Sequence, residues 1–347
     1  MSKKLSEITV IYGENPQQKC YGIDMLPGGA NDPLAIGNFE LTQGENPSFC
    51  NITDLDRMLQ TITHVGAVYS LNTGETPLIA LGAKHGNCCG AGVGDNWKQV
   101  VQNMLDGDLR AIFGGSLMLS FEVTGDVASE LVTYNSAYGK RLLDMVVAPS
   151  FTDEAKEILQ RKNGKLRLFS NPALANLDKN SLDSTKRDRY LRGGHITQDN
   201  YTSILDFDSK VTTKNSIPFS EAQKNSVMLA WAIAVTSNSN TITLVKDSML
   251  IGNGVGQQDR VSAAELAVKR AVAANHEVVG SVAFGDSFFP FPDGPEVLAK
   301  AGVKAIFATN GSVKDEEVAK TLTDLGVAFY TVPDNAGPDS GRGFYAH

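Results

Sequence analysis

Apolar runs alternate with amphipathic helical patterns along nearly the whole chain, and this alternation limits the folds open to it. Short apolar runs bounded by turn residues are typical of buried strands, and the segments between them space apolar residues as helices do. Strands separated by helices favour an α/β architecture with at least partly parallel sheets. In the first half the sequence predicts strands at 8–12, 77–83, 111–119, 144–150 and 165–169, and helices at 96–107, 127–136 and 153–164.

A polar stretch over residues 171–189 interrupts this pattern and predicts a long connection. After it, capping boxes at Ser220 and Ser262 each predict the start of a helix. The other predicted elements are a hairpin at 241–252, strands at 281–285, 303–309 and 327–332, and helices at 295–302 and 316–326. The sequence shows no obvious internal repeat. We therefore predict two α/β subdomains, residues 1–189 and 190–347.

The composition excludes several classes of partner. The formal charge of −8 over 347 residues argues against a nucleic-acid surface, and the sequence shows no basic stripe that could bind phosphates. The expected partners are therefore small molecules or proteins. No apolar run approaches the roughly 20 residues that span a bilayer, and no basic-then-apolar leader opens the sequence. We therefore expect no membrane association and a cytoplasmic location. The four cysteines form no CxxC pair, and reduced thiols are expected.

The segment KHGNCCG, residues 84–90, gathers reactive side chains after an apolar run, and three interpretations are open. His85 with Cys88 and Cys89 supplies zinc-type ligands, but neighbouring cysteines rarely reach one ion and no second ligand pair follows. A cysteine could be a nucleophile at a strand-to-helix turn, although small buried thiols commonly pack as hydrophobic residues. Lys84 and His85 could instead perform acid–base chemistry at the carboxyl end of a predicted strand, where α/β sheets present ligand sites.

Two motifs in the second half could line a ligand site. The loop GNGVGQQDR, residues 252–260, could bring its backbone close to a ligand while Arg260 binds an anionic or carboxamide group. A tight hairpin exit is the plainer interpretation, and the segment does not match a dinucleotide-binding fingerprint. Residues 285–295, GDSFFPFPDGP, could form an aromatic wall with an acidic rim for a flat heteroaromatic ligand, although core packing is the usual role of such aromatics.

Ten motifs follow one another in a fixed order along almost the whole chain. They are IYGENPQQ, SFCNITDLD, KHGNCCG, AIFGG, MVVAPSF, LRGGHITQD, TSNSNTI, IGNGVGQQDRV, GDSFFPFPD and NGSVKDEE. In this order they resemble the transformylase domain of the bifunctional AICAR transformylase/IMP cyclohydrolase family. KHGNCCG is similar to the family's KHxNPCG, and GDSFFPFPD to its SDAFFPFPD. A single motif would mean little, but ten colinear ones are specific.

The resemblance implies two cytidine-deaminase-like three-layer α/β subdomains, in a homodimer with the active site at the subunit interface. It also implies formyl transfer from the co-substrate 10-formyltetrahydrofolate to the 5-amino group of AICAR, which yields FAICAR and tetrahydrofolate in purine biosynthesis. The cyclohydrolase half of the family has no counterpart before Met1, so ring closure to IMP is not expected. No metal is implied.

The resemblance assigns the chemistry to three residues. His85 would be the base that takes the proton of the AICAR amine, a role typically worth about 10²–10⁴-fold in rate. Lys84 would stabilise the tetrahedral adduct and assist the departure of tetrahydrofolate. Asn240 would hold the formyl oxygen in an oxyanion-type contact.

Eight further residues match substrate contacts of the family. They are Tyr12, Asn51, Gly114, Asp144, Arg260, Phe288, Asp293 and Arg342. Among them, Arg260 would bind the carboxamide of AICAR, and Arg342 would approach its phosphate. Phe288 and Asp293 would line the nucleotide and folate pockets, respectively.

The chain also departs from the family pattern. Ile11 stands where the family has an arginine that helps to bind the substrate phosphate. Gln17 replaces a histidine, and Asn238 replaces the lysine of a KSN motif. Either another cation replaces the arginine or the substrate differs. The candidates to replace it are Lys3, Lys4 and Arg192.

Three functional classes remain open on this basis. The first is a stand-alone AICAR transformylase. The second is a non-catalytic or retargeted family member that binds a purine-like nucleotide or a folate, which the departures at Ile11, Gln17 and Asn238 motivate. The third is a metal-dependent deaminase that shares the fold.

Overall fold

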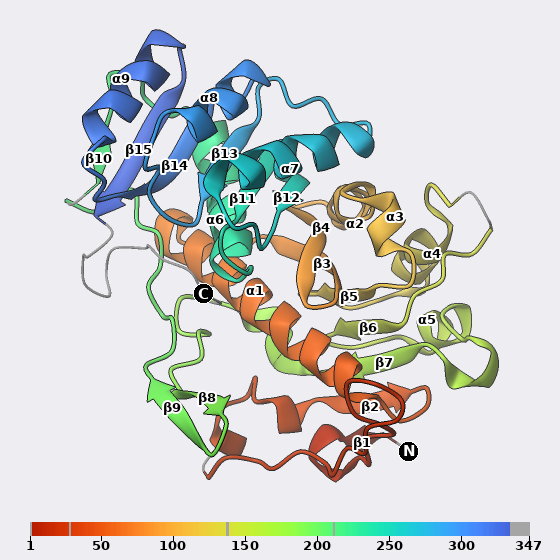
Figure 1. Cartoon of the computed structure of the whole chain (residues 1–347). Coiled ribbons are helices and arrows are strands. Elements are labelled where there is room, and N and C mark those ends of the chain that lie inside the picture. Colours follow the sequence, from red (N-terminus) through yellow and green to blue (C-terminus); the bar gives the residue numbers. More distant parts are fainter. Residues whose placement is uncertain (1, 28, 137–138, 211, 334–347) are drawn as a thin grey trace.

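The computed structural model describes residues 2–27, 29–136, 139–210 and 212–333. Within these residues thirteen strands form one continuous mixed sheet (Figure 1). In spatial order they are β1 (Lys3–Lys4), β2 (Glu40–Gln43), β7 (Arg167–Ser170), β6 (Met145–Ala148), β5 (Ser116–Leu119), β3 (Leu78–Lys84), β4 (Asn87–Gly94), β12 (Met249–Gly254), β11 (Ile242–Lys246), β13 (Val282–Gly285), β14 (Ala305–Asn310), β15 (Ala328–Pro333) and β10 (Thr213–Lys214). A separate hairpin consists of β8 (Arg187–Leu191) and β9 (Gly194–Gln198).

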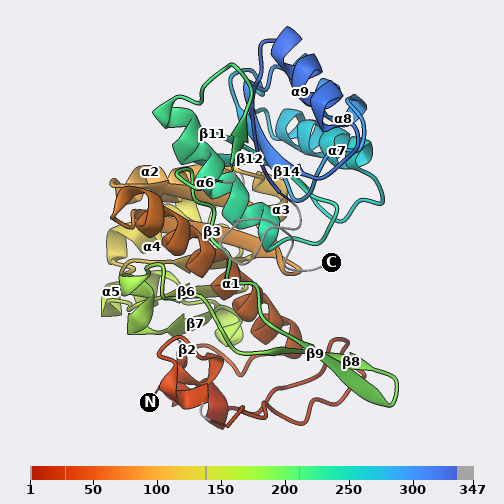
Figure 2. The ribbon, with the colours of Figure 1, turned by 90° about the vertical axis from the view of Figure 1, so that its left-hand side faces the viewer.

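The helices cover both faces of the sheet. They are α1 (Phe49–Thr73), α2 (Trp97–Asp106), α3 (Leu109–Ile112), α4 (Gly125–Thr133), α5 (Asp153–Ile158), α6 (Glu221–Val235), α7 (Arg260–Ala273), α8 (Asp293–Lys300) and α9 (Asp315–Asp324). Helices α1 and α6 lie side by side on one face, while α2, α4 and α5 with α7, α8 and α9 pack on the other (Figure 2). The predicted three-layer α/β fold class is confirmed.

The same arrangement of five strands occurs twice in the sheet. The first unit has the order β4-β3-β5-β6-β7 and the second the order β12-β11-β13-β14-β15. In each, an antiparallel hairpin is followed by three mutually parallel strands. Helix α1 precedes the first hairpin and α6 precedes the second. The structure therefore contains an internal repeat, although none is obvious in the sequence.

The repeat extends to the residues of the two hairpins. The segments KHGNCCGAGVG (84–94) and KDSMLIGNGVG (246–256) align without a gap at a shift of 162 positions. Each has a lysine at the end of its first strand and a GxGVG segment that begins on its second. The turn residues in both have positive φ: His85 (53°), Gly86 (70°), Asp247 (49°) and Ser248 (61°). This similarity is hidden in the sequence because only the lysine and the GxGVG residues are shared.

The two units are joined at the centre of the sheet. Strand β12 pairs antiparallel with β4, and Asn253 Nδ2 donates a hydrogen bond to the backbone oxygen of Cys88 at 3.2 Å. The predicted boundary between residues 189 and 190 falls within β8, in the long connection from β7 to α6. The division of the chain at that point stays a prediction. No helix among the described residues is long and apolar enough to cross a bilayer.

The long helix α1 positions much of the first unit. Ser48 begins it with a capping box, in which the side chains of Ser48 and Asn51 each accept the backbone N–H of the other. Gly74 ends it in the left-handed conformation, with φ of 80°. Residues 61–69 are buried all round, between the sheet and α6. That burial removes the polar face on which recognition of a helix from periodicity depends, and this helix was not predicted.

Three predicted elements are corrected. Residues 8–12 form no strand. The strand predicted at 111–119 begins only at Ser116, because the short helix α3 and a turn occupy the positions before it. Asp259, not Ser262, caps α7: its side chain accepts the backbone N–H of Ser262 at 2.7 Å.

Candidate active site

Lys84 and His85 lie at the tip of the first hairpin, between β3 and β4. Lys84 is the last residue of β3, and its Nζ donates a hydrogen bond to the backbone oxygen of Phe113 at 2.9 Å. His85 and Gly86 are the two turn residues, with the positive φ angles that a two-residue I′ turn requires. The His85 side chain is exposed. The segment is thus a hairpin turn, and the strand-to-helix turn considered for a thiol nucleophile is wrong.

Helix α1 holds this turn in place through Asp54. Asp54 Oδ1 accepts a hydrogen bond from the backbone N–H of Gly86 at 2.7 Å. Burial raises the pKa of the Asp54 carboxyl, while the Gly86 hydrogen bond and the nearby His85 oppose that rise. Asp54 lies in the motif SFCNITDLD, but the sequence predicts no role for it. Its contact fixes the backbone from which the His85 side chain projects.

Three predicted substrate contacts gather beside Lys84. Asn51 is only 4% exposed, because its side-chain oxygen takes part in the α1 cap and its Nδ2 donates to Asp144 Oδ2 at 2.9 Å. Asp144 also lies 3.6 Å from Arg167 Nη1, and its own side chain is 47% exposed. Gly114 has a φ of 71°, and a Cβ at this position would lie 3.9 Å from Lys84 Nζ. Of the Asn51 and Asp144 side chains, only the Asp144 carboxylate is open to a ligand.

The YGENP segment runs alongside the start of α1. The backbone oxygen of Tyr12 accepts the N–H of Phe49 at 3.1 Å, so Tyr12 lies next to the helix cap. Ile11 is 48% exposed at this place. The cations proposed to replace the family arginine lie elsewhere in the chain: Lys3 and Lys4 in the outermost strand β1, and Arg192 at the tip of the β8–β9 hairpin.

Asn240, Arg260 and Phe288 form a connected group in the second unit. Arg260 opens α7 and donates hydrogen bonds to Asn240 Oδ1 and to the backbone oxygen of Phe288. Its Nη1 also lies 3.3 Å from Asp286 Oδ1, and its guanidinium lies 6.0 Å from the centroid of the Phe288 ring. Asn240 Nδ2 donates to the backbone oxygen of Gln257 at 2.9 Å. The structure adds Asp286 to this group, a residue that the sequence places only in the possible acidic rim of residues 285–295.

Two other predicted substrate contacts, Phe288 and Asp293, lie before and at the start of α8. Asp293 is exposed at the start of α8, and its Oδ1 accepts the N–H of Gly294 at 2.8 Å. Phe288 is half-buried, whereas its neighbour Phe289 belongs to the core. Arg342 lies outside the described residues.

Two of the three glycines of GNGVGQQDR serve helix packing and not the approach of a ligand. Gly252 and Gly254 belong to β12, and a Cβ on them would lie 2.3 Å from Ala267 O and 2.1 Å from Ala263 O. Only glycine therefore lets α7 pack this closely on the strand. The expectation that this backbone approaches a ligand is wrong at these two positions, while Arg260 at the end of the segment does reach the Asn240 group.

One edge of the sheet carries both groups of predicted residues. At this edge β3, β12 and β13 end and β11 begins, because the β3–β4, β4–β12 and β11–β12 pairs are all antiparallel. Asn240 lies two residues before β11. Two strand spacings, about 10 Å, separate β11 from β4. The edge is also where the parallel strands β5, β6 and β7 begin, so the first unit presents its site at the amino ends of those strands.

A cavity of about 250 Å³ lies at this edge, next to the His85 turn. Its lining residues are Glu14, Cys50, Thr53, Asp54, Arg57, His85, Gly86, Asn87 and Asn238. Arg57 Nη2 on α1 donates to Asn238 Oδ1 at 3.1 Å, which connects the two units across the cavity. Asn238 replaces the family lysine, and the Arg57 guanidinium brings a positive charge to the same place.

The cysteines do not have the properties of a nucleophile. Burial raises the pKa of Cys88 to about 12, and burial likewise raises that of Cys89. Burial and the Asp54 and Glu14 carboxylates raise the pKa of Cys50, which lines the cavity. The thiols at these positions are therefore protonated at neutral pH. In the described ranges, no three His, Cys, Asp or Glu side chains are grouped so that they could hold a metal ion.

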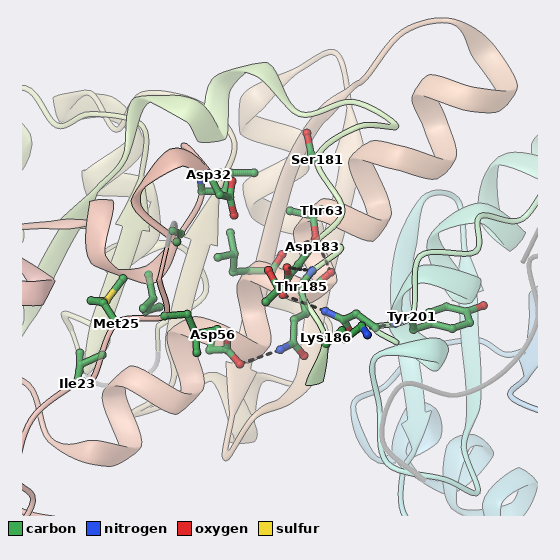
Figure 3. A pocket seen from close by; sticks show the side chains of 18 of the residues that line it. Ile23, Met25, Asp32, Asp56, Thr63, Ser181, Asp183, Thr185, Lys186 and Tyr201 are labelled. Atoms are coloured by element: carbon green, nitrogen blue, oxygen red, sulfur yellow. Dashed lines mark hydrogen bonds between the residues drawn. The ribbon is translucent and has the colours of Figure 1, made fainter. Parts of the chain in front are cut away.

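A second cavity, of about 260 Å³, lies against another side of α1 (Figure 3). Its walls come from segments 23–36 and 181–201 and from one side of α1, where Gln60 Nε2 donates to Asp56 Oδ2 at 2.8 Å. It contains none of the residues predicted from the sequence. Its histidine, His64, is buried, and burial lowers the pKa of His64 to about 4. The cavity beside His85 combines an exposed histidine, a carboxylate and both units, and is the candidate active site.

Comparisons with known proteins agree on one family. The family model described as AICARFT/IMPCHase bienzyme matches residues 2–270. The bifunctional purine biosynthesis protein PurH of Staphylococcus carnosus (strain TM300) is 33% identical over 317 residues, which cover 91% of this chain and 58% of that protein. PurH of Thermotoga maritima is 32% identical over 338 residues, covering 95% of this chain and 63% of that protein. The chain thus spans about six tenths of the length of these relatives.

Among solved structures, the dCMP deaminase of cyanophage S-TIM5 in its apo form is 19% identical and covers 32% of this chain and 98% of its own. Its TM-score of 0.24 is too low to support an argument. The family model, in contrast, matches more than half of the chain, and the PurH relatives match nine tenths of it. The chain belongs to the AICARFT/IMPCHase bienzyme family.

Proposed function

We propose that the protein transfers the formyl group of 10-formyltetrahydrofolate to the 5-amino group of AICAR, yielding FAICAR and tetrahydrofolate. The observation that carries the proposal is the His85 turn, which Asp54 holds on the wall of a cavity lined by both units. The relatives are named as bifunctional purine biosynthesis proteins, which supports a role in that pathway. We place the reaction in the cytoplasm.

The chemistry of the amine explains the need for a base. Its lone pair is conjugated into an imidazole that bears a carboxamide, so the nitrogen is a weak nucleophile until its proton leaves. The exposed imidazole of His85 would take that proton as the nitrogen attacks the formyl carbon. The tetrahedral adduct then collapses, and the folate nitrogen leaves with a proton.

Lys84 and Asn240 would act on the charge that develops during this step. The Lys84 ammonium is held by the backbone oxygen of Phe113, next to the His85 turn, where it can stabilise the adduct and protonate the leaving nitrogen. Asn240 Nδ2 donates one hydrogen to Gln257 and has a second one for the formyl oxygen. A donor of this kind is worth about 10²–10³-fold in kcat.

We further propose that the protein is a homodimer with the active site at the subunit interface. The β8–β9 hairpin stands out from the body of the molecule (Figure 2). It exposes three large apolar side chains: Tyr190 (83%), Leu191 (44%) and Ile196 (53%). Exposed apolar groups on a projecting hairpin support a contact with another chain.

The direct test measures tetrahydrofolate and FAICAR after mixing the protein with 10-formyltetrahydrofolate and AICAR. The two products are expected in equal amounts. Lys84→Ala should lower kcat by about 10²-fold or more. Lys246→Ala is the matched control, because Lys246 ends the first strand of the second hairpin and pairs with Glu277 at 2.9 Å. It should leave kcat unchanged.

The same assay distinguishes an AICAR transformylase from the alternative function. A retargeted or non-catalytic family member is the second candidate, on the observation that exposed Ile11 replaces a phosphate-binding arginine beside Tyr12. Tight binding of AICAR without release of tetrahydrofolate would favour that alternative. IMP, measured in the same samples, tests the expectation that this chain does not close the ring.

A further inference from the structure

Asp286 is a buried charge that the mechanism above does not use. It follows β13 directly, and its side chain is 0% exposed. Its Oδ1 lies 3.3 Å from Arg260 Nη1, and the Arg260 side chain is itself only 14% exposed. Burying an ion pair is costly, and such a pair is weak evidence for stability. A buried carboxylate at the site edge therefore calls for another explanation.

The internal repeat shows what the fold itself requires at this position. Ser120 follows β5 as Asp286 follows β13. The backbone N–H groups of Ser120 and Asp286 donate to equivalent carbonyl oxygens, of Ile79 (3.0 Å) and Thr241 (3.2 Å). In the first unit a neutral serine suffices, and its Oγ accepts the N–H of Ile79 at 2.9 Å. The charge at position 286 is therefore specific to the second unit.

The Arg260 side chain connects Asp286 to the Asn240 carboxamide. A guanidinium only donates hydrogen bonds, so it can meet only the oxygen of that carboxamide. The backbone oxygen of Gln257 only accepts, so it can meet only the nitrogen, at 2.9 Å. The Arg260 guanidinium and the Gln257 backbone oxygen therefore fix the orientation of the Asn240 carboxamide. The second hydrogen of Asn240 Nδ2 takes part in neither of these two hydrogen bonds.

We propose that Asp286 is a positioning residue, which holds Arg260 so that the Asn240 amide keeps its N–H directed at the formyl oxygen in the transition state. The inference rests on the proposed formyl transfer. Without the carboxylate, Arg260 keeps the Phe288 backbone oxygen as a partner but loses the charge that orients its Nη1 end. The amide then turns more freely, and its donor is no longer preorganised.

The kinetic effects of Asp286 substitutions distinguish a positioning residue from one that only supports the fold. Asp286→Asn and Asp286→Ser should each lower kcat by about 10- to 100-fold, with KM for the folate changed less than about threefold, because the contact of Asn240 with the formyl oxygen strengthens only in the transition state. Serine is the residue that the first unit uses at this place. A rise in KM with kcat unchanged would overturn the inference.

A double-mutant cycle tests the connection. In an Asn240→Ala background, Asp286→Asn should cause no further fall in kcat, since the group that it positions is gone. Ser120→Ala, at the equivalent place in the first unit, is the control. It should leave kcat unchanged in both backgrounds. Full additivity of Asp286→Asn and Asn240→Ala would contradict the proposal.

A measurement without turnover separates this inference from the proposed function. The side-chain amide of Asn240 gives a ¹⁵N–¹H signal that can be assigned by its loss in Asn240→Ala. In both Asp286 variants its hydrogens should exchange with water at least tenfold faster than in the wild type, whereas Ser120→Ala should leave the rate unchanged. If the wild-type protein forms no FAICAR, the proposed function fails, but faster exchange still supports the positioning contact. Unchanged exchange in both variants overturns it.

Discussion

His85 and Asp247 occupy the same position in two matching hairpin turns, with φ of 53° and 49°. Aspartate and histidine are both among the residues that tolerate this left-handed conformation. The turn can therefore form without an imidazole, and the proposed role of His85 as a base is one that the turn itself does not require. The repeat provides this comparison within a single chain.

Substitution of Cys88 and Cys89, which follow the turn, tests whether these cysteines have a chemical or a packing role. Replacing both with alanine should leave kcat within about threefold of the wild type, because burial keeps the two thiols protonated. Steady-state turnover of the double variant is the measurement, and its circular dichroism spectrum shows whether it is folded. Loss of activity in a folded double variant would restore the thiol nucleophile.

His64 predicts a pH dependence of stability that does not depend on the active site. Burial lowers its pKa from 6.5 to about 4, so between these values the unfolded chain binds a proton that the folded chain does not. Stability is therefore lost as the pH falls through this window, by up to about 3 kcal/mol. Urea unfolding at several pH values should show a smaller loss in His64→Gln than in the wild type. Equal losses would show that His64 is not the group responsible.

The sequence could locate some site residues and not others. Lys84 and His85 follow an apolar strand and carry chemistry in their own side chains, so pattern and resemblance both point to them. Asp54 and Asp286 gain their roles only through partners 32 and 26 residues away. No local pattern distinguishes them from surface carboxylates. Only comparison of the two units in the structure distinguishes Asp286, because it places that residue at the position of Ser120.

At the level of the elements, the glycine-rich segment was the most misleading part of the sequence. GxGxG ahead of a helix is compatible with a ligand loop, yet Gly252 and Gly254 lie in a strand under α7. Gly90 and Gly92 do the same under α2, where a Cβ would lie 2.0 Å from Met104 O and 2.4 Å from Val100 O. The spacing therefore marks close packing of a helix on a hairpin strand, twice.

Gly254→Ala should destabilise the protein measurably. Its Cβ would lie 2.1 Å from the backbone oxygen of Ala263, which cannot move without shifting α7. Overpacking of this kind costs about 1–3 kcal/mol. Gly29→Ala is the control, because the nearest atom to an added Cβ there is Leu26 Cβ at 3.9 Å, an ordinary contact, and the residue lies outside the proposed interface hairpin. Thermal unfolding should show a lower midpoint for Gly254→Ala only, and equal midpoints would contradict the packing role.

Several elements lie where their apolar periodicity or the length of their apolar run predicts them. Helices α2 and α4 and the strands β6 and β14 follow the expected periods and lie where they were predicted. The sequence does not predict α1, because its middle is buried all round and its cap pairs Ser48 with Asn51, whereas the equally buried α6 carries the recognisable Ser–Gln capping box. The α7 cap was misplaced because Asp259 and Ser262 are both good capping residues, and only the structure shows which side chain accepts the N–H.

At the scale of the whole molecule, the continuous sheet explains how residues from the two units come to one edge. Strands β4 and β12 pair at its centre, and the repeat runs in opposite directions on either side of them. The α/β class could be predicted from the alternation of elements alone. The pairing of the two units could not, because nothing in either hairpin identifies the other as its neighbour.

The exposed apolar side chains of the β8–β9 hairpin predict that two chains associate. We expect the protein to have a mass of two 37.1 kDa chains in light scattering. Tyr190→Asp with Ile196→Asp should shift it towards one chain, because charges would then replace the exposed apolar groups of the proposed interface. Tyr21→Asp is the control, as Tyr21 is 89% exposed on another segment. A wild-type protein with the mass of one chain would contradict the dimer.

We propose that formyl transfer requires the His85 side chain itself, and not the conformation of its turn. The most direct measurement is the kcat for AICAR formylation in His85→Asp, which installs the residue of the equivalent turn, with Asp247→Ala as the control. We expect a folded His85→Asp protein whose kcat is lower by about 10²–10⁴-fold, and an unchanged kcat for Asp247→Ala. A folded His85→Asp protein with the kcat of the wild type would contradict this proposal.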